Sequence, residues 1–143
     1  MSDLHAWWDN VTLDMQLSLL INGYVEQYFT NIDKKIGLGF SFAQTDSINI
    51  RKYKVIAWHP SLKLYPIAIE NGKKMVADLL NSNIMKKLHV EVKEQDEKMY
   101  GTRNNEIKKH VFLITIDLDK STKAEKQAIY AYFGLLGFDK FIR

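Results

Sequence analysis

The run Val-Phe-Leu-Ile-Thr-Ile at residues 111–116 constrains the fold of this chain more than any other feature of its sequence. β-branched and aromatic residues fit the pleated surface of a sheet, and this run offers no polar face that could turn toward water. We expect a strand over residues 107–118, with Val111, Leu113, Ile114 and Ile116 in the core. The strand should lie in the centre of a sheet and be covered on both faces.

Weaker patterns predict the elements around this strand. Alternation of apolar and polar residues predicts further strands at 36–42, 48–58, 62–69 and 85–95, with a polar loop from 95 to 106. Apolar residues at helical spacing predict helices over 12–30 and 71–81. Thr122 and Glu125 have the spacing of a capping box that starts a last helix, and Gly137 is placed to end it. Residues 138–142 can add a short closing strand.

These elements predict an α+β fold, with a mainly antiparallel sheet of five to six strands and two to three helices. From residue 62 onward the expected order is β-α-β-β-α with a closing β, which resembles a ferredoxin-like unit over residues 62–143 in topology. Pro66 lacks a backbone donor and would place the strand at 62–69 at an edge. The length fits a single domain, residues 1–143, with a helical arm at 1–35 that packs on the α+β body or exchanges with another chain.

Cysteine is absent, and its absence excludes several classes of site. A disulfide framework, a thiolate zinc site, an iron–sulfur cluster and a cysteine nucleophile all require it. The first residues carry acid where a signal peptide carries Lys or Arg, and no stretch approaches 18 apolar residues. We therefore expect a cytoplasmic protein without a membrane-spanning segment and without a cofactor.

Charge is distributed unevenly along the sequence. Residues 1–50 hold six acidic and two basic side chains, whereas residues 51–143 hold 11 acidic and 18 basic ones. Such asymmetry indicates either a basic binding face or an acidic helix that lies against a basic sheet within one fold.

Histidines are the natural candidates for acid–base chemistry because their charge changes near neutral pH. His89 and Glu91 share one face of a predicted strand, His110 lies on the central strand, and His59 is displayed by the turn before Pro60. A histidine pair across adjacent strands, together with Glu91, would be able to hold a divalent metal or exchange protons. The spacing matches no recognised metal motif, and a cross-strand histidine between Lys and Glu is more often a partly exposed surface residue, so we predict no metal site.

Two carboxylates at the end of the central strand also have two interpretations. Asp117 and Asp119 flank Leu118 and would be able to hold Mg²⁺ at the end of the strand. They can instead end the strand and assist the start of the last helix. The second interpretation requires no further ligand, and we favour it.

A pI near 9 makes nucleic acid a partner to consider. Phosphate binding requires several cations brought together, and aromatic rings beside them can stack on bases. The candidate residues for such an interface are Arg51, Lys52, Tyr53, Lys54, Lys86 and Lys87. Against this interpretation, acidic residues lie near many of the lysines, and the net charge of the chain is only +3.

The adjacent tryptophans Trp7 and Trp8 suggest a protein interface. Neighbouring side chains on a helix point about 100° apart, so one apolar stripe does not easily bury both. Tryptophan is enriched at interfaces because it supplies a large and rigid contact area. The alternative is that a terminal segment folds back and uses both rings as a lid over the core.

By elimination, we predict a small intracellular, non-enzymatic protein that binds another protein, as an inhibitor, an immunity protein or a phage or plasmid accessory factor does. The first alternative is an RNA- or DNA-binding module, with metal-independent nuclease chemistry through His59, His89 or His110. A third is a small-molecule enzyme whose pocket forms between the subunits of a homo-oligomer.

Overall fold

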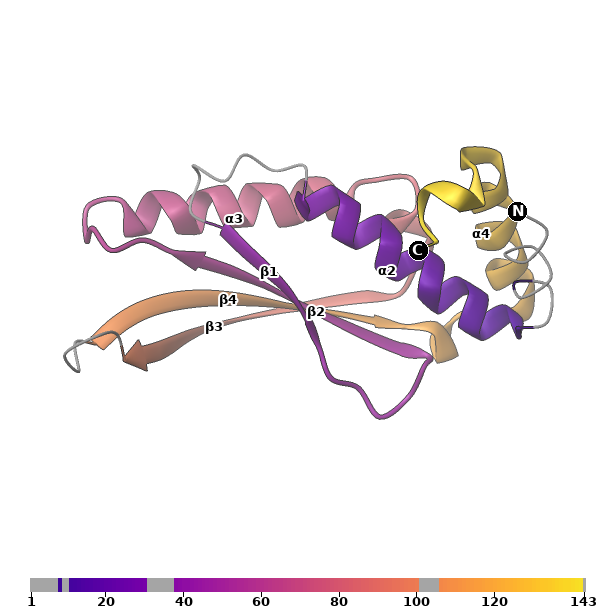
Figure 1. Cartoon of the computed structure of the whole chain (residues 1–143), viewed down its shortest axis with the longest axis horizontal. Helices are drawn as coiled ribbons and strands as arrows, with labels where there is room; N and C mark the ends of the chain where they lie inside the picture. Colours follow the sequence, from indigo (N-terminus) through magenta and orange to yellow (C-terminus); the bar gives the residue numbers. More distant parts are fainter. Residues whose placement is uncertain (1–7, 9–10, 31–37, 101–105, 143) are drawn as a thin grey trace.

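The computed structural model describes residue 8 and residues 11–30, 38–100 and 106–142 (Figure 1). In chain order the elements are α2 (Leu13–Thr30), β1 (Leu38–Ala43), β2 (Ile50–Trp58), α3 (Tyr65–Leu80), the 3₁₀ turn η2 (Met85–Lys87), β3 (Val90–Tyr100), β4 (Glu106–Asp117), the 3₁₀ turn η4 (Leu118–Lys120), α4 (Lys123–Leu136) and the 3₁₀ turn η5 (Phe138–Lys140). The predicted α+β class is confirmed, with three longer helices and four strands among the described residues.

The four strands form one antiparallel sheet in the order β1-β2-β4-β3. β4 pairs with β2 on one side and with β3 on the other, so Val111 lies opposite Ile56 in one neighbour and Gln95 in the other. The predicted interior position of the 111–116 run is therefore confirmed.

The two faces of the sheet differ in what covers them. The described helices lie over one face (Figure 1), and the β4 side chains that point toward them, Phe112, Ile114 and Ile116, are at most 1% exposed. Val111 and Leu113 point to the opposite face, since successive side chains of a strand alternate. Val111 is buried there and Leu113 is half-buried, although no described helix covers this open face. The described helices therefore cover β4 on one face only, and the prediction that this strand is covered on both faces is wrong for the open face.

The strand predicted over residues 62–69 is wrong, because this segment makes a turn and then starts α3. Pro66 lies in the first turn of α3, where its missing N–H breaks no helical hydrogen bond and its fixed φ suits the helix. The amides of Leu64 and Tyr65 both donate to the carbonyl of Ser61, which closes the turn before the helix. The alternation of apolar and polar residues in this segment therefore belongs to a turn followed by the first residues of a helix, and not to a strand.

The predicted closing strand at 138–142 is also wrong, because the chain forms η5 there and buries Phe141 against the helices. The described residues therefore contain four strands instead of five to six. The ferredoxin-like unit of residues 62–143 is not confirmed, since its first and last strands are helical.

The hairpin of β3 and β4 is longer than the sequence pattern predicts. β3 begins at Val90 and extends to Tyr100, through half of the segment expected to be a polar loop. The preceding residues from Met85 form η2 instead, with Met85 buried. The polar residues of β3 are tolerated in a strand because charged partners lie opposite them on β4, such as Lys109 opposite Glu97.

α2 occupies the residues predicted for the N-terminal helix and packs on the body of the same chain. Leu17, Leu20 and Ile21 are fully buried. The contact with the C-terminal turn is so close that a Cβ atom on Gly23 would overlap the carbonyl of Phe141. Glycine is therefore required where α2 meets this turn.

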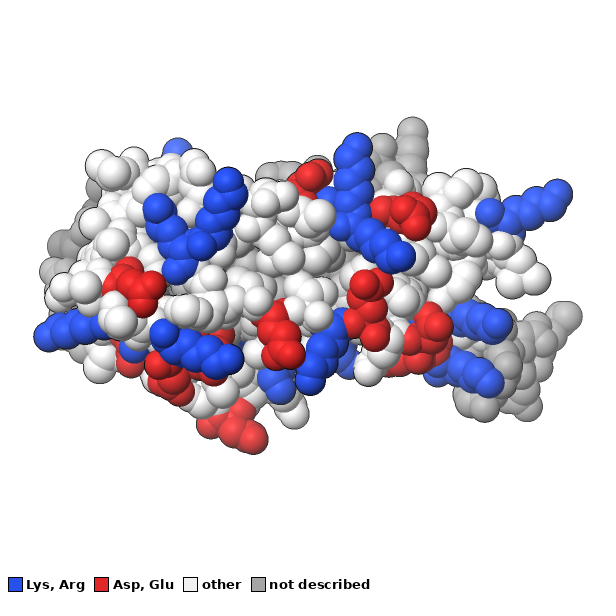
Figure 2. Space-filling view, turned by 180° about the vertical axis from the view of Figure 1, so that it is seen from behind, with Lys and Arg blue, Asp and Glu red and all other residues white. Residues whose placement is uncertain are grey.

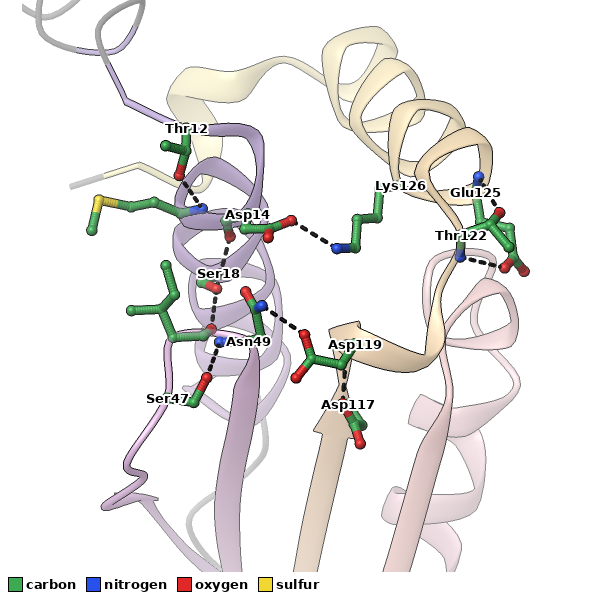
Figure 3. A network of polar contacts seen from close by, with 12 residues as sticks. Thr12, Asp14, Ser18, Ser47, Asn49, Asp117, Asp119, Thr122, Glu125 and Lys126 are labelled. Carbon is green, nitrogen blue, oxygen red and sulfur yellow. Dashed lines mark hydrogen bonds and ion pairs between the residues drawn. The ribbon is translucent and has the colours of Figure 1, made fainter.

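Polar contacts also join α2 to α4 and to the loop before β2 (Figure 3). Lys126 Nζ of α4 lies 2.9 Å from Asp14 Oδ1 of α2. The hydroxyl of Ser18, one turn further along α2, hydrogen-bonds to the backbone carbonyls of Asp14 and Ile48. These contacts fix α2 to two segments that are distant in sequence.

Asp117 and Asp119 end β4 and help to connect it to α4 (Figure 3). The Asp117 carboxylate accepts from the amide of Asp119 at 3.0 Å, and Asp119 accepts from the Asn49 side chain at 2.7 Å. The predicted capping box is confirmed, with the Thr122 and Glu125 side chains each accepting from the other's amide. Both aspartates are thus used structurally, as the simpler interpretation expects.

Candidate functional site

The structure does not bring the histidines and Glu91 into one cluster. His110 lies opposite Asp96, whereas the carbonyl of His89 accepts from the amide of Asp117 at the other end of β4. Seven residues of strand correspond to about 24 Å. Glu91 lies opposite Thr115 and points to the open face, whereas His110 lies on the helix side with Phe112. His59 instead stabilises the turn that contains it, because its Nδ1 accepts a hydrogen bond from the amide of Ser61 at 3.0 Å.

His110 bridges two carboxylates of the neighbouring strand instead. Its Nδ1 lies 2.6 Å from Asp96 Oδ1 and its Nε2 lies 2.8 Å from Glu94 Oε1. Partial burial alone lowers the pKa of His110, but the hydrogen bonds to Asp96 and Glu94 and their negative charges raise it above its ordinary value. Each ring nitrogen faces a carboxylate oxygen, so this geometry favours the protonated ring, which donates from both nitrogens and leaves neither one free for a metal or a substrate proton.

The basic residues proposed for nucleic acid lie in three separate places. Arg51 Nη2 donates to Thr45 Oγ1 and to the carbonyl of Ser47, both at 2.8 Å, and so holds the loop before β2. Lys52 and Lys54 point to the open face, and Lys86 and Lys87 lie on η2. The predicted group therefore does not form one surface.

Tyr53 lies in the core and not beside these lysines. It is 1% exposed, its hydroxyl donates to Asn22 Oδ1 of α2 at 2.6 Å, and burial raises its pKa far above the ordinary value. A ring in this position cannot stack on a base.

Carboxylates accompany the lysines on the surface of the protein. Lys109 Nζ on the open face lies 3.5 Å from Glu97 Oε1. A hydrogen bond from Gln95, together with the charges of Lys109 and Lys54, lowers the pKa of Glu97. Figure 2 shows acidic and basic side chains alternating over one face, without a continuous basic area.

Trp8 packs into the core as the fold-back alternative describes. The residue is 5% exposed, and its Nε1 donates to the hydroxyl of Tyr130 on α4 at 2.9 Å. Its ring also stacks on Tyr130 and packs against Phe138. An indole in this position is not available to anchor a partner. Trp7 lies outside the described residues.

One exposed apolar feature was not predicted, namely the turn that leads into α3. Leu62 is 82% exposed, Leu64 43% and Ile67 53%. We call these three residues the apolar turn. The sequence interpretation missed it because a strand at 62–69 would have placed alternate residues in the core. Pro66 is tolerated both in an edge strand and in the first turn of a helix, so it did not distinguish the two elements.

A second feature is a pocket of about 330 Å³ between η2 and α4. It is lined by Lys86, Lys87, Leu88, His89, Glu125, Ala128 and Ile129. The pocket therefore brings together residues from two hypotheses. Lys86 and Lys87 are candidate nucleic-acid-binding residues, and His89 is a candidate catalytic residue.

Among the described residues, no group of three or more metal-binding side chains is placed to hold an ion. None of the described helices combines the length and the apolar character needed to cross a membrane. No model of a known protein family matches the chain, and neither a curated protein sequence nor a solved structure matches it.

Proposed function

We propose that this protein acts by binding another protein, and that the apolar turn is the contact surface. The observation that carries the proposal is the exposure of Leu62, Leu64 and Ile67 within six consecutive residues. Single exposed aliphatic side chains are normal on soluble proteins, but neighbouring ones are typical of interaction sites.

Burial of these side chains supplies the driving force for the contact. Removing apolar surface from water contributes roughly 25 cal/mol for each Å². Leu62 is 82% exposed and Ile67 is 53% exposed, so both have apolar surface left to bury, whereas each residue of the core is already withdrawn from water. Leu135 of α4 is 85% exposed but stands alone in the sequence, whereas the apolar turn offers three neighbouring side chains.

The charges at the turn indicate the chemistry of the partner. Lys63 stands between Leu62 and Leu64 and is exposed. The first turn of α3 holds no acidic residue, and no side chain caps it, so the positive end of the helix dipole is not compensated there. The matching surface is an apolar cleft bordered by carboxylates.

Paired serine variants test the proposal. Leu62→Ser combined with Ile67→Ser removes the apolar contact, and Leu135→Ser is the matched control because Leu135 is 85% exposed on α4. A partner is first captured from cell extract with the native protein, identified, purified and titrated against each variant by calorimetry. We expect the paired variant to weaken binding about a hundredfold and the control to leave it within about twofold.

Two results would contradict the proposal. One is a partner that binds the paired variant as tightly as the native protein. The other is selective binding of an oligonucleotide that persists at roughly 200 mM salt, where contacts that depend on phosphate charge alone are largely lost.

A further inference from the structure

The pocket between η2 and α4 combines an apolar floor with a cationic rim. Leu88 is 8% exposed and Ile129 is 1% exposed, and Ala128 adds a small side chain beside them. Lys86, Lys87, His89 and Glu125 supply the polar part of the lining. Ligand pockets often have this division, because apolar surface supplies affinity and a few charges supply orientation.

Both lysines of the rim lack an ionic partner among the described residues. Lys73, Lys109 and Lys126 each lie within 4.0 Å of a carboxylate, whereas no such contact involves Lys86 or Lys87. The Nζ of Lys87 lies 5.8 Å from the centre of the Tyr132 ring, which favours a position of the ammonium beside α4.

The single carboxylate of the lining is already engaged. Glu125 accepts from the amide of Thr122 at 2.8 Å, and hydrogen bonding with Thr122 lowers the pKa of Glu125. The Glu125 carboxylate is therefore negatively charged at neutral pH and stabilises the start of α4 through the capping box. The two lysines of the lining exceed this carboxylate by one positive charge.

From this arrangement we propose that the pocket binds a small organic anion with an apolar part, such as an aryl phosphate. The anionic group contacts Lys86, Lys87 and His89, and the apolar part lies on Leu88 and Ile129. This site is independent of the apolar turn, since α3 separates the two (Figure 1).

Calorimetric titration of the full chain with phenyl phosphate at constant ionic strength tests the site. Inorganic phosphate and benzyl alcohol serve as probes of the charge alone and of the ring alone. We expect each of these two probes to bind at least about tenfold more weakly than phenyl phosphate, because only phenyl phosphate satisfies both parts of the lining.

Four variants test where the binding occurs. Replacing both pocket lysines, Lys86→Gln with Lys87→Gln, should weaken phenyl phosphate binding about tenfold or more. The control, Lys73→Gln with Lys74→Gln, makes the same change of charge on α3. Its affinity for phenyl phosphate should stay within about twofold of that of the native protein. Ala128→Leu fills the pocket without a change of charge and should also weaken binding about tenfold. Leu62→Ser with Ile67→Ser should bind phenyl phosphate as the native protein does.

Several outcomes overturn the assignment. These are no binding of phenyl phosphate, equal binding of benzyl alcohol or of inorganic phosphate, an equal loss with the α3 lysine pair, or no effect of Ala128→Leu. Circular dichroism checks that each variant is folded. If the Lys86 and Lys87 variant does not fold, the Ala128→Leu result decides.

Discussion

The two ends of this molecule are stabilised in different ways (Figure 1). At one end, α2, α4 and η5 pack through aromatic side chains, with Tyr24, Phe133 and Phe141 in mutual contact. At the other end, the β3–β4 hairpin is held by charged pairs such as His110 with Asp96, and the apolar turn is exposed. Aromatic packing is therefore concentrated where α2, α4 and η5 meet, and the apolar turn lies at the opposite end.

A surface that must bind a partner cannot also bury its apolar side chains in its own core. The hairpin end is paired along the β3–β4 ladder and carries charged pairs on its surface, and Leu62 and Ile67 stay exposed at this end. Substitutions at the two ends should accordingly have very different effects on stability, and the following predictions test this.

The largest effect is expected for Phe133→Ala in the aromatic end. Phe133 is fully buried on α4, so its removal leaves a cavity among Tyr24, Phe141 and their neighbours. We expect a loss of about 3–5 kcal/mol in the free energy of unfolding, measured by urea titration. A loss below about 1 kcal/mol would show that the aromatic end does not dominate stability.

A smaller loss is expected for Gly23→Ala, which tests the close approach of α2 to the C-terminal turn. The new methyl group would overlap the carbonyl of Phe141, so backbone must shift. Overpacking of this kind costs about 1–3 kcal/mol in the same titration. In an exposed helix the same change is stabilising, so a gain in stability would mean that the two segments do not touch.

The charged end should depend on pH through His110. Its folded-state pKa is raised, so the stability it contributes is fully present below its unfolded-state pKa, about 6.5, and is lost as the pH rises through the raised value. We expect His110→Gln to cost more stability at about pH 6 than at about pH 9, measured by thermal unfolding at both values.

An equal cost of His110→Gln at both values would show that the bridge between the two carboxylates contributes nothing to folding.

The smallest effect on stability is expected for Leu62→Ser in the apolar turn. The side chain is 82% exposed, so its loss should change the free energy of unfolding by no more than about 0.5 kcal/mol. A decrease above about 1 kcal/mol in denaturant titration would mean that the turn is part of the core, and its assignment as a contact surface would then fail.

Local sequence patterns were sufficient for several elements of the fold. Leu17, Leu20 and Ile21 at helical spacing identified α2, and the spacing of Thr122 and Glu125 identified the start of α4. The 111–116 run identified an interior strand. Each of these signals depends on residues that are close in sequence, and local geometry alone determines which face they share.

Pro66 shows where local patterns were ambiguous. A proline is tolerated both in an edge strand and in the first turn of a helix, so the alternating residues around it fit either element. Ala68, Val76 and Leu79 of α3 are buried, and their packing against the sheet favours the helix over an edge strand. Tertiary contacts therefore overrode the pattern that predicted a strand.

The candidate sites were less predictable than the fold, because their residues are distant in sequence. Lys87 and Ile129 meet in one pocket, and His110 meets Glu94 and Asp96 only through the register of β3 on β4. A shift of one residue in that register would turn these side chains to the opposite face of the sheet.

The sequence by itself determined the fold class, the interior strand, the long helices at both ends of the chain and the capping box of α4, because each follows from periodicity or from side chains a few residues apart. Only the tertiary structure decided that Trp8 is buried, that Leu62 is exposed and that Lys86, Lys87 and His89 surround one pocket. Burial and proximity are properties of the packed chain, since they depend on which distant segments cover a residue.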